Sequence, residues 1–555
     1  MPDSSEPFNI ASRLRAIAEK NPSRIAVVYP DGRESSGRAS YSTLTFRQFD
    51  EESDRYAHGL TRIGIKQGCR VLIMIPAGIE FLALSFALFK IGAVLILIDP
   101  GMGKKNLLHC IDEVEPQALI SVPLGHLLKK LYRKPFKQVK YAVTHGRRWF
   151  WGGNTLKQIR ENVWRKFTVG TLTRLDPAAI VFTTGSTGIP KGVPYCHGTL
   201  DSQIRSIQGC FSIEENEVGL PAFPPFALFC IAMGTTCVMP KMDPTRLAQV
   251  DPIEMLRLIE SYHVTYSFGS PAFWNRVSRH CVEHRIRIPS IKKIIMAGAP
   301  VSGIILGRLK EILGEDAESH TPYGATEALP LTSITGSEVL TETVQYSNQG
   351  AGICVGRPIH GITLKVIGIS DEVIAEWNES LVLPQGQVGE IVVKGPVVTT
   401  EYYQREYQTA LSKIADGGSV WHRMGDVGYL DEKGRLWFCG RKSHRVITAN
   451  KTLFTVQCES VFNQHENVFR SALVGIGPRK SQRPVIIIEP KSYKMTSHAE
   501  AAKKFTQELL DLGNRNELTR EIKDVLFYSD FPVDFRHNSK ILREQLALWA
   551  EEKIK

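Results

Sequence analysis

The chain has 555 residues, of which 43% are hydrophobic and 23% are charged. These proportions are those of a soluble globular protein, and the length argues against a single domain. The net charge of +11 and the pI of about 9.0 suit anionic ligands, acidic membrane surfaces or nucleic acid. Because no dense Lys/Arg tract is evident, we interpret the excess as a solvated basic surface and expect no nucleic-acid partner.

The ten cysteines and the first residues of the chain indicate in which cellular compartment the protein is expected. The cysteines form no C-x-x-C pair, and no Cys/His cluster has the spacing of metal ligands. The first residues, MPDSSEPFNI, lack the basic start and apolar core of a signal peptide. We therefore expect a reduced, cytoplasmic protein.

The first three hundred or so residues alternate short apolar runs with helical segments. This alternation predicts α/β layers with largely parallel sheets. Strands are expected at residues 70–76, 93–98, 118–121, 178–184 and 292–298, and amphipathic helices at residues 271–284 and 301–313.

One apolar run, FLALSFALFKIGAVLILI at residues 81–98, is about long enough to span a bilayer. Lys90 lies in its middle, Gly92 follows, and the second half is rich in Val and Ile. We therefore interpret it as a buried helix at residues 81–90 and a buried strand at residues 93–98. No transmembrane segment is expected.

The segment at residues 144–167 combines Arg and Lys with three Trp. A basic, aromatic surface of this kind suits peripheral contact with a membrane or a partner. The alternative is a loop and helix that pack their Trp side chains onto the body of the protein. We favour this alternative.

From about residue 353 the sequence changes to short strand runs punctuated by Gly, which predicts a β-rich unit at about residues 350–440. The last hundred residues return to mixed strands and helices, with charged helices expected at residues 501–512 and 540–553.

These patterns predict two domains. The polar run GRKSHR at residues 440–445 is the expected hinge. Residues 1–440 are expected to form a large α/β N-terminal domain, and residues 441–555 a small, mobile α+β C-terminal lid. The active site is expected at the interface between them.

The stretch TTGSTGIPKG, residues 183–192, follows an apolar run and predicts a phosphate-binding loop. In a P-loop, Gly precedes the Lys and Ser or Thr follows it, whereas here Pro190 precedes Lys191 and Gly192 follows. Small residues still let backbone N–H groups approach an anion, hydroxyls donate, and Lys adds a charge. The alternative is a flexible surface turn.

Four further stretches follow: GAP at residues 298–300, TPYGATEALP at 321–330, WHRMGDVGYLDEKGRLWFCGRK at 421–442 and FRHNSKILREQL at 535–546. Their order and content resemble the acyl-adenylate-forming enzyme superfamily, which includes acyl-CoA synthetases, luciferases and peptide-synthetase adenylation domains. The resemblance covers nearly the whole chain.

The resemblance implies that the loop holds the β- and γ-phosphates of ATP. In this chemistry a carboxylate attacks the α-phosphorus and pyrophosphate leaves, so cations and N–H groups must neutralise the reacting anions. The implied phosphate contacts are Thr183, Thr184, Gly185, Ser186, Thr187, Gly188 and Lys191.

Three further residues match catalytic positions of the superfamily. Thr326 matches the residue that hydrogen-bonds the α-phosphate, and Glu327 matches the Mg²⁺ ligand, a role that suits a carboxylate. Lys540 lies in NSK, where the family usually has SGK, and is implied to bridge the substrate carboxylate and the α-phosphate. The alternatives are a surface acid for Glu327 and an exposed Lys at a helix start for Lys540.

Five further residues match superfamily positions that contact the ribose or the adenine of ATP. Asp426 matches the residue that accepts both ribose hydroxyls, and Arg441 matches the Arg that contacts ribose and phosphate before the hinge. Gly298, Ala299 and Tyr323 match positions that line adenine, although GAP also suits a tight turn.

The acyl site is implied by two stretches. FPPFALF lies where relatives carry the motif that gates this site, so Phe223, Phe226 and Phe229 are expected to line a hydrophobic pocket, with plain core as the alternative. His197 follows the phosphate loop, where many relatives have His near the acyl pocket, and a packed His is the alternative.

The segment after the hinge departs from ordinary CoA ligases, in which GR-x-x-D, V/I-x-x-S-G and H/F-R follow one another. Ser443 occupies a position that usually holds Asp or Lys, Asn450 replaces a loop Gly, and Thr452 replaces the following Arg. Asn tolerates the left-handed conformation, so the turn is expected to persist. The Asn450 side chain narrows the pantetheine tunnel and a cation for the CoA phosphates is lost, which argues against CoA use.

Residues 8–14, 98–111 and 531–550 resemble the β-lactone synthetases of long-chain olefin biosynthesis. That family adenylates a long-chain α-alkyl-β-hydroxy acid with ATP and Mg²⁺, and the substrate's own hydroxyl then closes the lactone. An intramolecular nucleophile needs no CoA. The resemblance implies a thiolase, a reductase and a lactone decarboxylase as pathway partners.

Three other functions compete with this hypothesis. The first is a long-chain fatty acyl-CoA or acyl-AMP ligase. The second is a nucleotide-binding regulator without catalysis, against which the joint presence of Glu327, Asp426, Arg441 and Lys540 argues. The third is a basic nucleic-acid binder, for which no recognised module is found.

Overall fold

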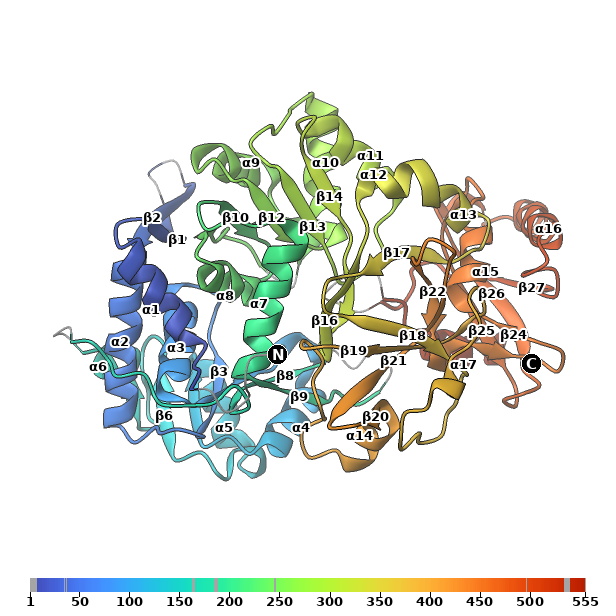
Figure 1. Ribbon diagram of the computed structural model, residues 1–555. Helices are drawn as coiled ribbons and strands as arrows, with labels where there is room; N and C mark the ends of the chain where they lie inside the picture. The colour runs from blue at the N-terminus through green and yellow to red at the C-terminus, as the bar shows by residue number, and fades with distance from the viewer. Residues whose placement is uncertain are drawn as a thin grey trace.

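A computed structural model describes residues 7–33, 35, 37–161, 165–183, 188–243, 246–495, 497–533 and 540–554. Figure 1 shows sheets and helices from blue to green, a β-rich part in yellow and orange, and a smaller red part at the C-terminal end. This confirms the expected α/β class.

Seven strands of the described residues form a first sheet, in the order β7-β6-β5-β3-β4-β8-β9. Its strands pair in parallel except β8 and β9, which are antiparallel. The run ALIS forms β5. This strand is buried along its whole length, as is typical of a strand in a parallel sheet that is covered on both faces. The strands are β3 (Arg70–Met74), β4 (Val94–Leu97), β5 (Ala118–Ser121), β6 (Tyr141–Thr144), β7 (Asn154–Thr155), β8 (Pro177–Phe182) and β9 (Gly192–Cys196).

A second sheet has the order β14-β13-β12-β10-β11-β1-β2 and is parallel apart from the antiparallel pair of β1 and β2. The strands are β1 (Ile25–Arg33), β2 (Ala39–Thr45), β10 (Val218–Pro221), β11 (Thr236–Val238), β12 (Tyr266–Gly269), β13 (Lys293–Met296) and β14 (Glu318–His320).

Helices of this half begin at local signals in the sequence. Thr45 and Gln48 form a capping box at the start of α2, and Ser270 caps α10, whose first residue is Pro271. The helices are α1 (Ala11–Lys20), α2 (Phe46–Arg62), α3 (Ile79–Ile91), α4 (Lys104–Val114), α5 (Pro123–Leu131), α6 (Leu156–Ile159), α7 (His197–Phe211), α8 (Pro224–Met233), α9 (Pro252–Ser261), α10 (Pro271–His284) and α11 (Gly303–Ile312).

The apolar run at residues 81–98 divides into α3 and β4, as expected. Gly92 ends the helix in the left-handed conformation, at φ +78°. Lys90 is fully buried, and its Nζ lies 2.6 Å from Asp50 Oδ1 and 2.5 Å from Asp54 Oδ1, so its charge is neutralised inside the core. Across the described ranges, no helix has the length and hydropathy needed to cross a membrane.

The β-rich part begins at Tyr323, earlier than the expected position near residue 350. The sequence does not reveal this start, because Gly and Pro at residues 321–330 interrupt the alternation of apolar and polar residues that is typical of a strand. The sheet order is β15-β16-β17-β22-β21-β19-β18, with β20 paired to β21. The elements are β15 (Tyr323–Ala325), β16 (Ala328–Ser333), α12 (Gly336–Glu338), α13 (Val344–Asn348), β17 (Ile353–Pro358), β18 (Thr363–Ile367), β19 (Gly389–Lys394), α14 (Glu406–Ser412), β20 (Lys413–Asp416), β21 (Ser419–Leu430) and β22 (Leu436–Arg441).

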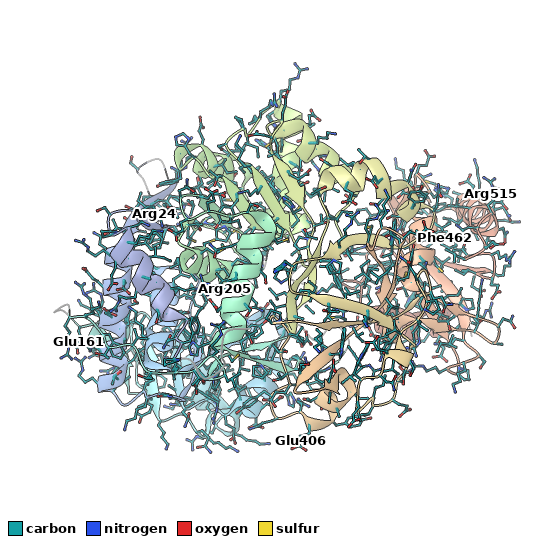
Figure 2. All side chains as sticks on the ribbon, in the orientation of Figure 1. Arg24, Glu161, Arg205, Glu406, Phe462 and Arg515 are labelled. Atoms are coloured by element: carbon teal, nitrogen blue, oxygen red, sulfur yellow. The ribbon has the colours of Figure 1, made fainter. Side chains whose placement is uncertain are left out.

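The C-terminal part has its own core. Two clusters, one around Phe462 and one around Leu546, draw their buried members from residues 446–550. Figure 2 shows Phe462 within this part and Arg515 at its edge. The elements are β23 (Val446–Ile447), β24 (Thr452–Leu453), α15 (Thr455–Phe462), β25 (Val468–Ile476), β26 (Arg483–Pro490), α16 (Ala499–Asn514), β27 (Asp524–Phe527) and α17 (Arg543–Ile554).

The separate core supports the proposed division into residues 1–440 and 441–555. The last helix begins at Arg543 rather than at Lys540 as expected. The reason is that Ile541 forms an antiparallel bridge with Val533, which holds its backbone in an extended conformation.

The aromatic side chains after β6 divide between the core and the surface. Trp151 packs as expected, since its Nε1 donates to Thr144 Oγ1 at 3.0 Å and its ring stacks on His126. Trp149 remains 53% exposed, so the packing interpretation is wrong for this Trp, and the neighbouring Phe150 is 66% exposed. The third tryptophan, Trp164, lies outside the described residues.

Candidate active site

Asp426, Tyr323 and Arg441 meet where β15 lies near the paired strands β21 and β22. Asp426 and Arg441 are direct partners in the strand register. Tyr323 Oη donates to Asp426 Oδ2 at 2.5 Å, and Arg441 Nη1 lies 2.9 Å from Asp426 Oδ1. Tyr323 therefore joins two residues more than one hundred positions later in the chain in one polar cluster.

The Asp426 carboxylate is buried but retains an acceptor. Burial raises the pKa of Asp426, although Arg441 and the Tyr323 hydroxyl act in the opposite direction. Oδ1 forms an ion pair without an aligned hydrogen bond from any described residue. A buried carboxylate oxygen of this kind can still accept from a ligand hydroxyl, because it has more than one lone pair.

Glu327 lies between β15 and β16 and is held from two sides. Tyr402 Oη donates to Glu327 Oε1 at 2.5 Å. The backbone carbonyl of Glu327 accepts from Thr399 N at 2.9 Å and from Thr399 Oγ1 at 3.1 Å. Among the described residues, Tyr402 donates to Oε1 of this carboxylate and so orients it.

A buried lysine supports this arrangement. Lys413, at the start of β20, donates from Nζ to the carbonyl of Thr399, which in turn holds Glu327. Burial lowers the pKa of Lys413 to about 7, and the Glu327 charge partly opposes this shift. Sequence reasoning missed Tyr402, Thr399 and Lys413, because they lie in no recognised motif and reach the site only through the fold.

The proposed phosphate loop joins β8 to β9. Thr183 N donates to the Lys191 carbonyl at 3.0 Å and Lys191 N donates to Thr183 Oγ1 at 3.1 Å, so the two ends of the loop are fixed to each other. Lys191 Nζ lies 4.4 Å from the centre of the Tyr402 ring, on the residue that holds Glu327. Gly188 is exposed, and Thr184, Gly185, Ser186 and Thr187 lie outside the described residues.

Three other expected contacts, Gly298, Ala299 and Thr326, follow or lie between strands. Gly298 and Ala299 follow the carboxyl end of β13, and Gly298 is exposed with φ +94°. Ligands of open α/β sheets bind beyond the carboxyl ends of the strands. Thr326 is half-buried, and its carbonyl accepts from Tyr195 Oη at 2.5 Å.

Lys540 reaches the site from the C-terminal part. Its positive charge acts to lower the pKa of Asp426, which places it within electrostatic range of the Asp426 cluster. The structure therefore brings Lys540 toward residues more than one hundred positions earlier in the chain.

Ion pairs anchor the segment after Arg441. Lys442 Nζ lies 2.9 Å from Glu390 Oε1, and the same buried carboxylate accepts from Arg423 Nη2 at 2.7 Å. Asp371 Oδ2 accepts from Arg445 at 2.7 Å and from Arg479 at 2.8 Å. These contacts join residues after Arg441 to the preceding part of the chain.

The sequence profile described as AMP-binding enzyme matches residues 14–403. The chain belongs to the AMP-binding enzyme family. Enzymes of this family use ATP, which agrees with the polar cluster formed by Asp426, Tyr323 and Arg441.

Two relatives of this AMP-binding enzyme match along almost their whole length. The olefin beta-lactone synthetase of Xanthomonas campestris pv. campestris is 42% identical over 551 residues, which cover 98% of each chain. That of Stenotrophomonas maltophilia is 42% identical over 560 residues, covering 99% of each. The ATP-bound structure of MatB from Rhodopseudomonas palustris shares the fold, with a TM-score of 0.78 at 20% identity over 99% of this chain and 100% of that one.

The three Phe residues expected to line an acyl pocket of this AMP-binding enzyme lie next to one another, and Phe226 and Phe229 pack against the main core. Phe223, Phe226 and Phe229 are half-buried, with ring centres 5.5 and 5.7 Å apart in succession. Phe226 also stacks on Phe268, at the end of β12, with centres 3.9 Å apart. The half-buried positions leave both interpretations open, so the role of these residues in an acyl pocket stays a prediction.

His197 lies in the packed interior. It is fully buried, its Nδ1 accepts from Ile10 N at 3.2 Å, and its ring meets Phe89 edge-on. Burial lowers the pKa of His197 to about 4. This position favours the packed alternative over a place in the acyl pocket.

The segment after the hinge forms a closed hairpin. Val446–Ile447 pairs with Thr452–Leu453, and Thr448 Oγ1 accepts from Asn450 N at 3.2 Å and Lys451 N at 3.1 Å. The turn therefore persists, but its cause differs from the expected one. Asn450 does not take the left-handed conformation, and the Thr448 side chain holds the turn instead.

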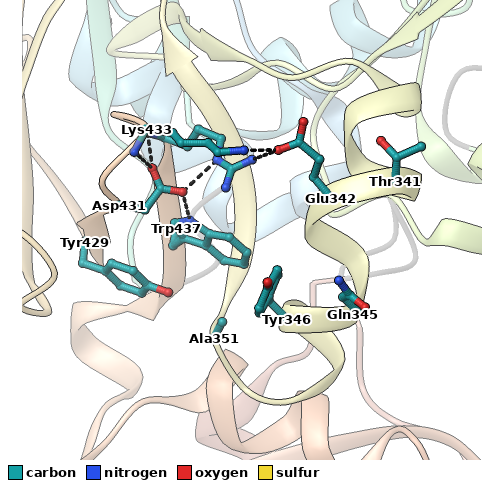
Figure 3. A pocket seen from close by; sticks show the side chains of 10 residues that line it. Thr341, Glu342, Gln345, Tyr346, Ala351, Tyr429, Asp431, Lys433 and Trp437 are labelled. Carbon is teal, nitrogen blue, oxygen red and sulfur yellow. Dashed lines mark hydrogen bonds and ion pairs between the residues drawn. The ribbon is translucent and has the colours of Figure 1, made fainter.

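A separate cavity of about 470 Å³ lies in the β-rich part (Figure 3). Its charged groups pair with one another, since Arg435 contacts both Glu342 and Asp431, and Lys433 contacts Glu342. Trp437 Nε1 also donates to Asp431. None of the predicted site residues lines this cavity.

Proposed function

We propose that the protein is an ATP-dependent β-lactone synthetase acting on a long-chain α-alkyl-β-hydroxy acid. The observation that carries this proposal is the 42% identity, along essentially the whole chain, to two olefin beta-lactone synthetases. The geometry of the site supports the first half of the reaction, in which an acid is activated by ATP.

In the proposed ATP site, Asp426 Oδ1 and Oδ2 receive the ribose hydroxyls while Arg441 contacts ribose and phosphate. Gly298, Ala299 and Tyr323 line adenine. The loop residues Thr183 to Gly188 and Lys191 hold the departing pyrophosphate, and Thr326 contacts the α-phosphate. The buried acceptor on Asp426 and the exposed end of β13 support these assignments.

Mg²⁺ fits the residues present. The ion usually keeps waters and takes one or two carboxylates together with substrate phosphates, so a single oriented Glu is an adequate protein ligand. Glu327 would bind it through Oε2, while Tyr402 holds Oε1. When bound, Mg²⁺ neutralises charge on the phosphates.

The first step joins the acid to AMP. A carboxylate oxygen of the substrate attacks the α-phosphorus, and the bond from that phosphorus to pyrophosphate breaks. Lys540 draws the carboxylate and the α-phosphate together, and Lys191 stabilises the leaving pyrophosphate. Both lysines act as cations that reduce repulsion between two anions.

The second step closes the ring. The β-hydroxyl oxygen attacks the acyl carbon, the bond from this carbon to AMP breaks, and the hydroxyl proton is lost to solvent. The hydroxyl is already next to the acyl carbon, so its effective concentration is high and no CoA is needed. The Phe223, Phe226 and Phe229 wall holds an alkyl chain.

The alternative is a long-chain acyl-CoA or acyl-AMP ligase. The hairpin at residues 446–453 argues against CoA, because it is closed by internal hydrogen bonds and carries Thr452 where CoA ligases have a cation.

A product assay with and without CoA tests the proposal. The protein is incubated with ATP, Mg²⁺ and a long-chain α-alkyl-β-hydroxy acid, and the product is identified by NMR. We expect a β-lactone and AMP in equal amounts, unchanged by CoA, and none with Lys540→Ala. A thioester formed only with CoA would overturn the proposal in favour of the ligase.

The proposal extends to organisation and partners. Residues 1–440 form the catalytic body and residues 441–555 a mobile lid that carries Lys540. A thiolase and a reductase are the enzymes that supply such a β-hydroxy acid, and a lactone decarboxylase consumes the product. We place the reaction in the cytoplasm.

A further inference from the structure

One segment carries an unusual share of the positive charge. Residues 116–160 contain ten Lys and Arg and no Asp or Glu, whereas the whole chain has a net charge of +11. Acidic partners come from outside the segment, as with Lys137 and Glu115 at 2.7 Å or Arg160 and Glu52 at 2.5 Å. The basic excess of the chain is therefore concentrated, although no short run of the sequence shows it.

The same segment exposes large apolar side chains. Leu124 and Leu131 are 73% and 68% exposed, and their spacing of seven residues places them on one face of α5. Trp149 and Phe150, in the loop after β6, are 53% and 66% exposed. Exposed leucine and tryptophan are costly in water unless another phase or partner covers them.

Contacts join these two elements into one surface. Lys130, on α5, places its Nζ 4.2 Å from the centre of the Phe150 ring. Trp151 is half-buried and stacks on His126, also on α5, which fixes the base of the loop while Trp149 and Phe150 stay outside. In Figure 1, α5 and β6 lie at the lower edge of the blue part, away from the red C-terminal part.

We propose that this surface, defined by Leu124, Lys130, Leu131, Arg147, Trp149 and Phe150, docks onto an anionic lipid bilayer. Aromatic side chains favour the membrane interface, and Lys and Arg favour anionic headgroups. The combination fits a bilayer better than nucleic acid, which offers phosphates but no apolar phase for two leucines. Docking would also bring the enzyme to the phase where a long-chain acid collects, a benefit that rests on the proposed function.

Vesicle co-sedimentation tests the proposal. The full chain is mixed with vesicles of phosphatidylcholine alone or with 30% phosphatidylglycerol added (about one lipid in three), at low and high salt. We expect binding to the anionic vesicles that weakens with salt, because each basic side chain near the surface contributes about 1 kcal/mol, or about five-fold in binding. Equal binding to both vesicle types, or none to either, would overturn the proposal.

Matched variants distinguish vesicle binding through the docking surface from nonspecific binding by other parts of the protein. Trp149→Ala combined with Leu131→Ser should weaken vesicle binding at least about ten-fold, and Lys130→Glu with Arg147→Glu should do the same. Ile304→Ser, at an equally exposed 68% position on α11, and Lys503→Glu with Lys504→Glu on α16 should bind as wild type does. If the control and surface variants lose binding equally, the assignment to this surface is wrong.

Adenylation provides an independent readout. ATP–pyrophosphate exchange should be unchanged in all these variants, since none of the altered residues contacts the proposed ATP site. Failure of vesicle binding with normal exchange would reject the membrane proposal and leave the proposed function intact. If wild type ignores vesicles but loses a dimer on Trp149→Ala, the surface belongs to a second copy of the chain and the lipid proposal is rejected.

Discussion

The Tyr402 hydroxyl donates a 2.5 Å hydrogen bond to Glu327 Oε1. The face of the same ring lies 4.4 Å from Lys191 Nζ. One side chain therefore fixes the proposed Mg²⁺ ligand and positions the cation of the phosphate loop, although 75 residues separate it from Glu327. Orienting groups of this kind usually matter almost as much as the ligand they hold.

Tyr402→Phe is expected to weaken Mg²⁺ use. The change keeps the ring beneath Lys191 but removes the donor to Glu327, so exchange at limiting Mg²⁺ should fall about 10- to 100-fold. The measurement is ATP–pyrophosphate exchange across a range of Mg²⁺ concentrations. Tyr403→Phe removes a neighbouring hydroxyl that does not contact Glu327 and should leave the curve unchanged. An unaltered Mg²⁺ dependence in Tyr402→Phe would place the metal ligand elsewhere.

Lys540→Ala is expected to abolish activation of the acid while leaving nucleotide binding intact. Loss of one preorganised charge contact in the transition state should lower the exchange rate at least about 100-fold. ATP affinity, measured by calorimetry, should change little, because Asp426 and Arg441 remain. Lys553→Ala, near the end of α17, is the control. Wild-type exchange in Lys540→Ala would remove this residue from the mechanism.

The stability of the protein should fall in mild acid because of His197. Burial lowers its pKa to about 4 from an ordinary 6.5, so between these values the unfolded chain takes up a proton that the folded chain does not. The free energy of unfolding should therefore decrease as the pH falls from 6.5 to 4, by about 3 kcal/mol from this residue. His197→Asn keeps an acceptor for Ile10 N and does not titrate. Parallel pH curves from denaturant unfolding of the two proteins would contradict the prediction.

Asp371→Asn is expected to loosen the arrangement that presents Lys540. The change weakens the contacts to Arg445 and Arg479, and two partly exposed ion pairs contribute about 0–1 kcal/mol each, so exchange should fall about 2- to 10-fold. ATP binding should not change, and high salt should bring wild type toward the variant. Glu372→Gln alters the neighbouring charge without touching either Arg and serves as the control. A variant as fast as wild type at low salt would show that these pairs do not hold the lid.

Much of the fold follows from local sequence patterns. The amphipathic pattern at residues 271–284 predicts a helix with the bounds of α10, and Ser270 and Pro271 at its start agree with this prediction. The apolar run at 81–98 divides at Gly92 for a similar local reason. Patterns of this kind depend on residues a few positions apart, which the sequence displays directly.

Sequence reasoning is incomplete where tertiary contacts determine the bounds of an element or the members of the site. Strands β15 and β16 escape it because Gly and Pro obscure their pattern, although the two strands pair with each other and β16 pairs with the next strand, β17. Lys540 was expected at a helix start, but the bridge between Val533 and Ile541 delays the helix to Arg543. The motifs identify residues such as Glu327 and Asp426, whereas Tyr402 and Lys413 lie in no motif and are found only from their hydrogen bonds around Glu327.

The ion pairs of Glu390 affect how the C-terminal part could rotate about the expected hinge. Removing one partner of a buried ion pair usually costs about 3–5 kcal/mol, because a bare charge stays behind. Here Arg423 and Lys442 share the same carboxylate, and Arg423 belongs to the N-terminal body. When a swing about the hinge carries Lys442 away, Glu390 keeps its Arg423 contact. In the proposed movement of the lid, the doubled pairing would therefore let Lys442 leave while Glu390 keeps a partner for its buried charge.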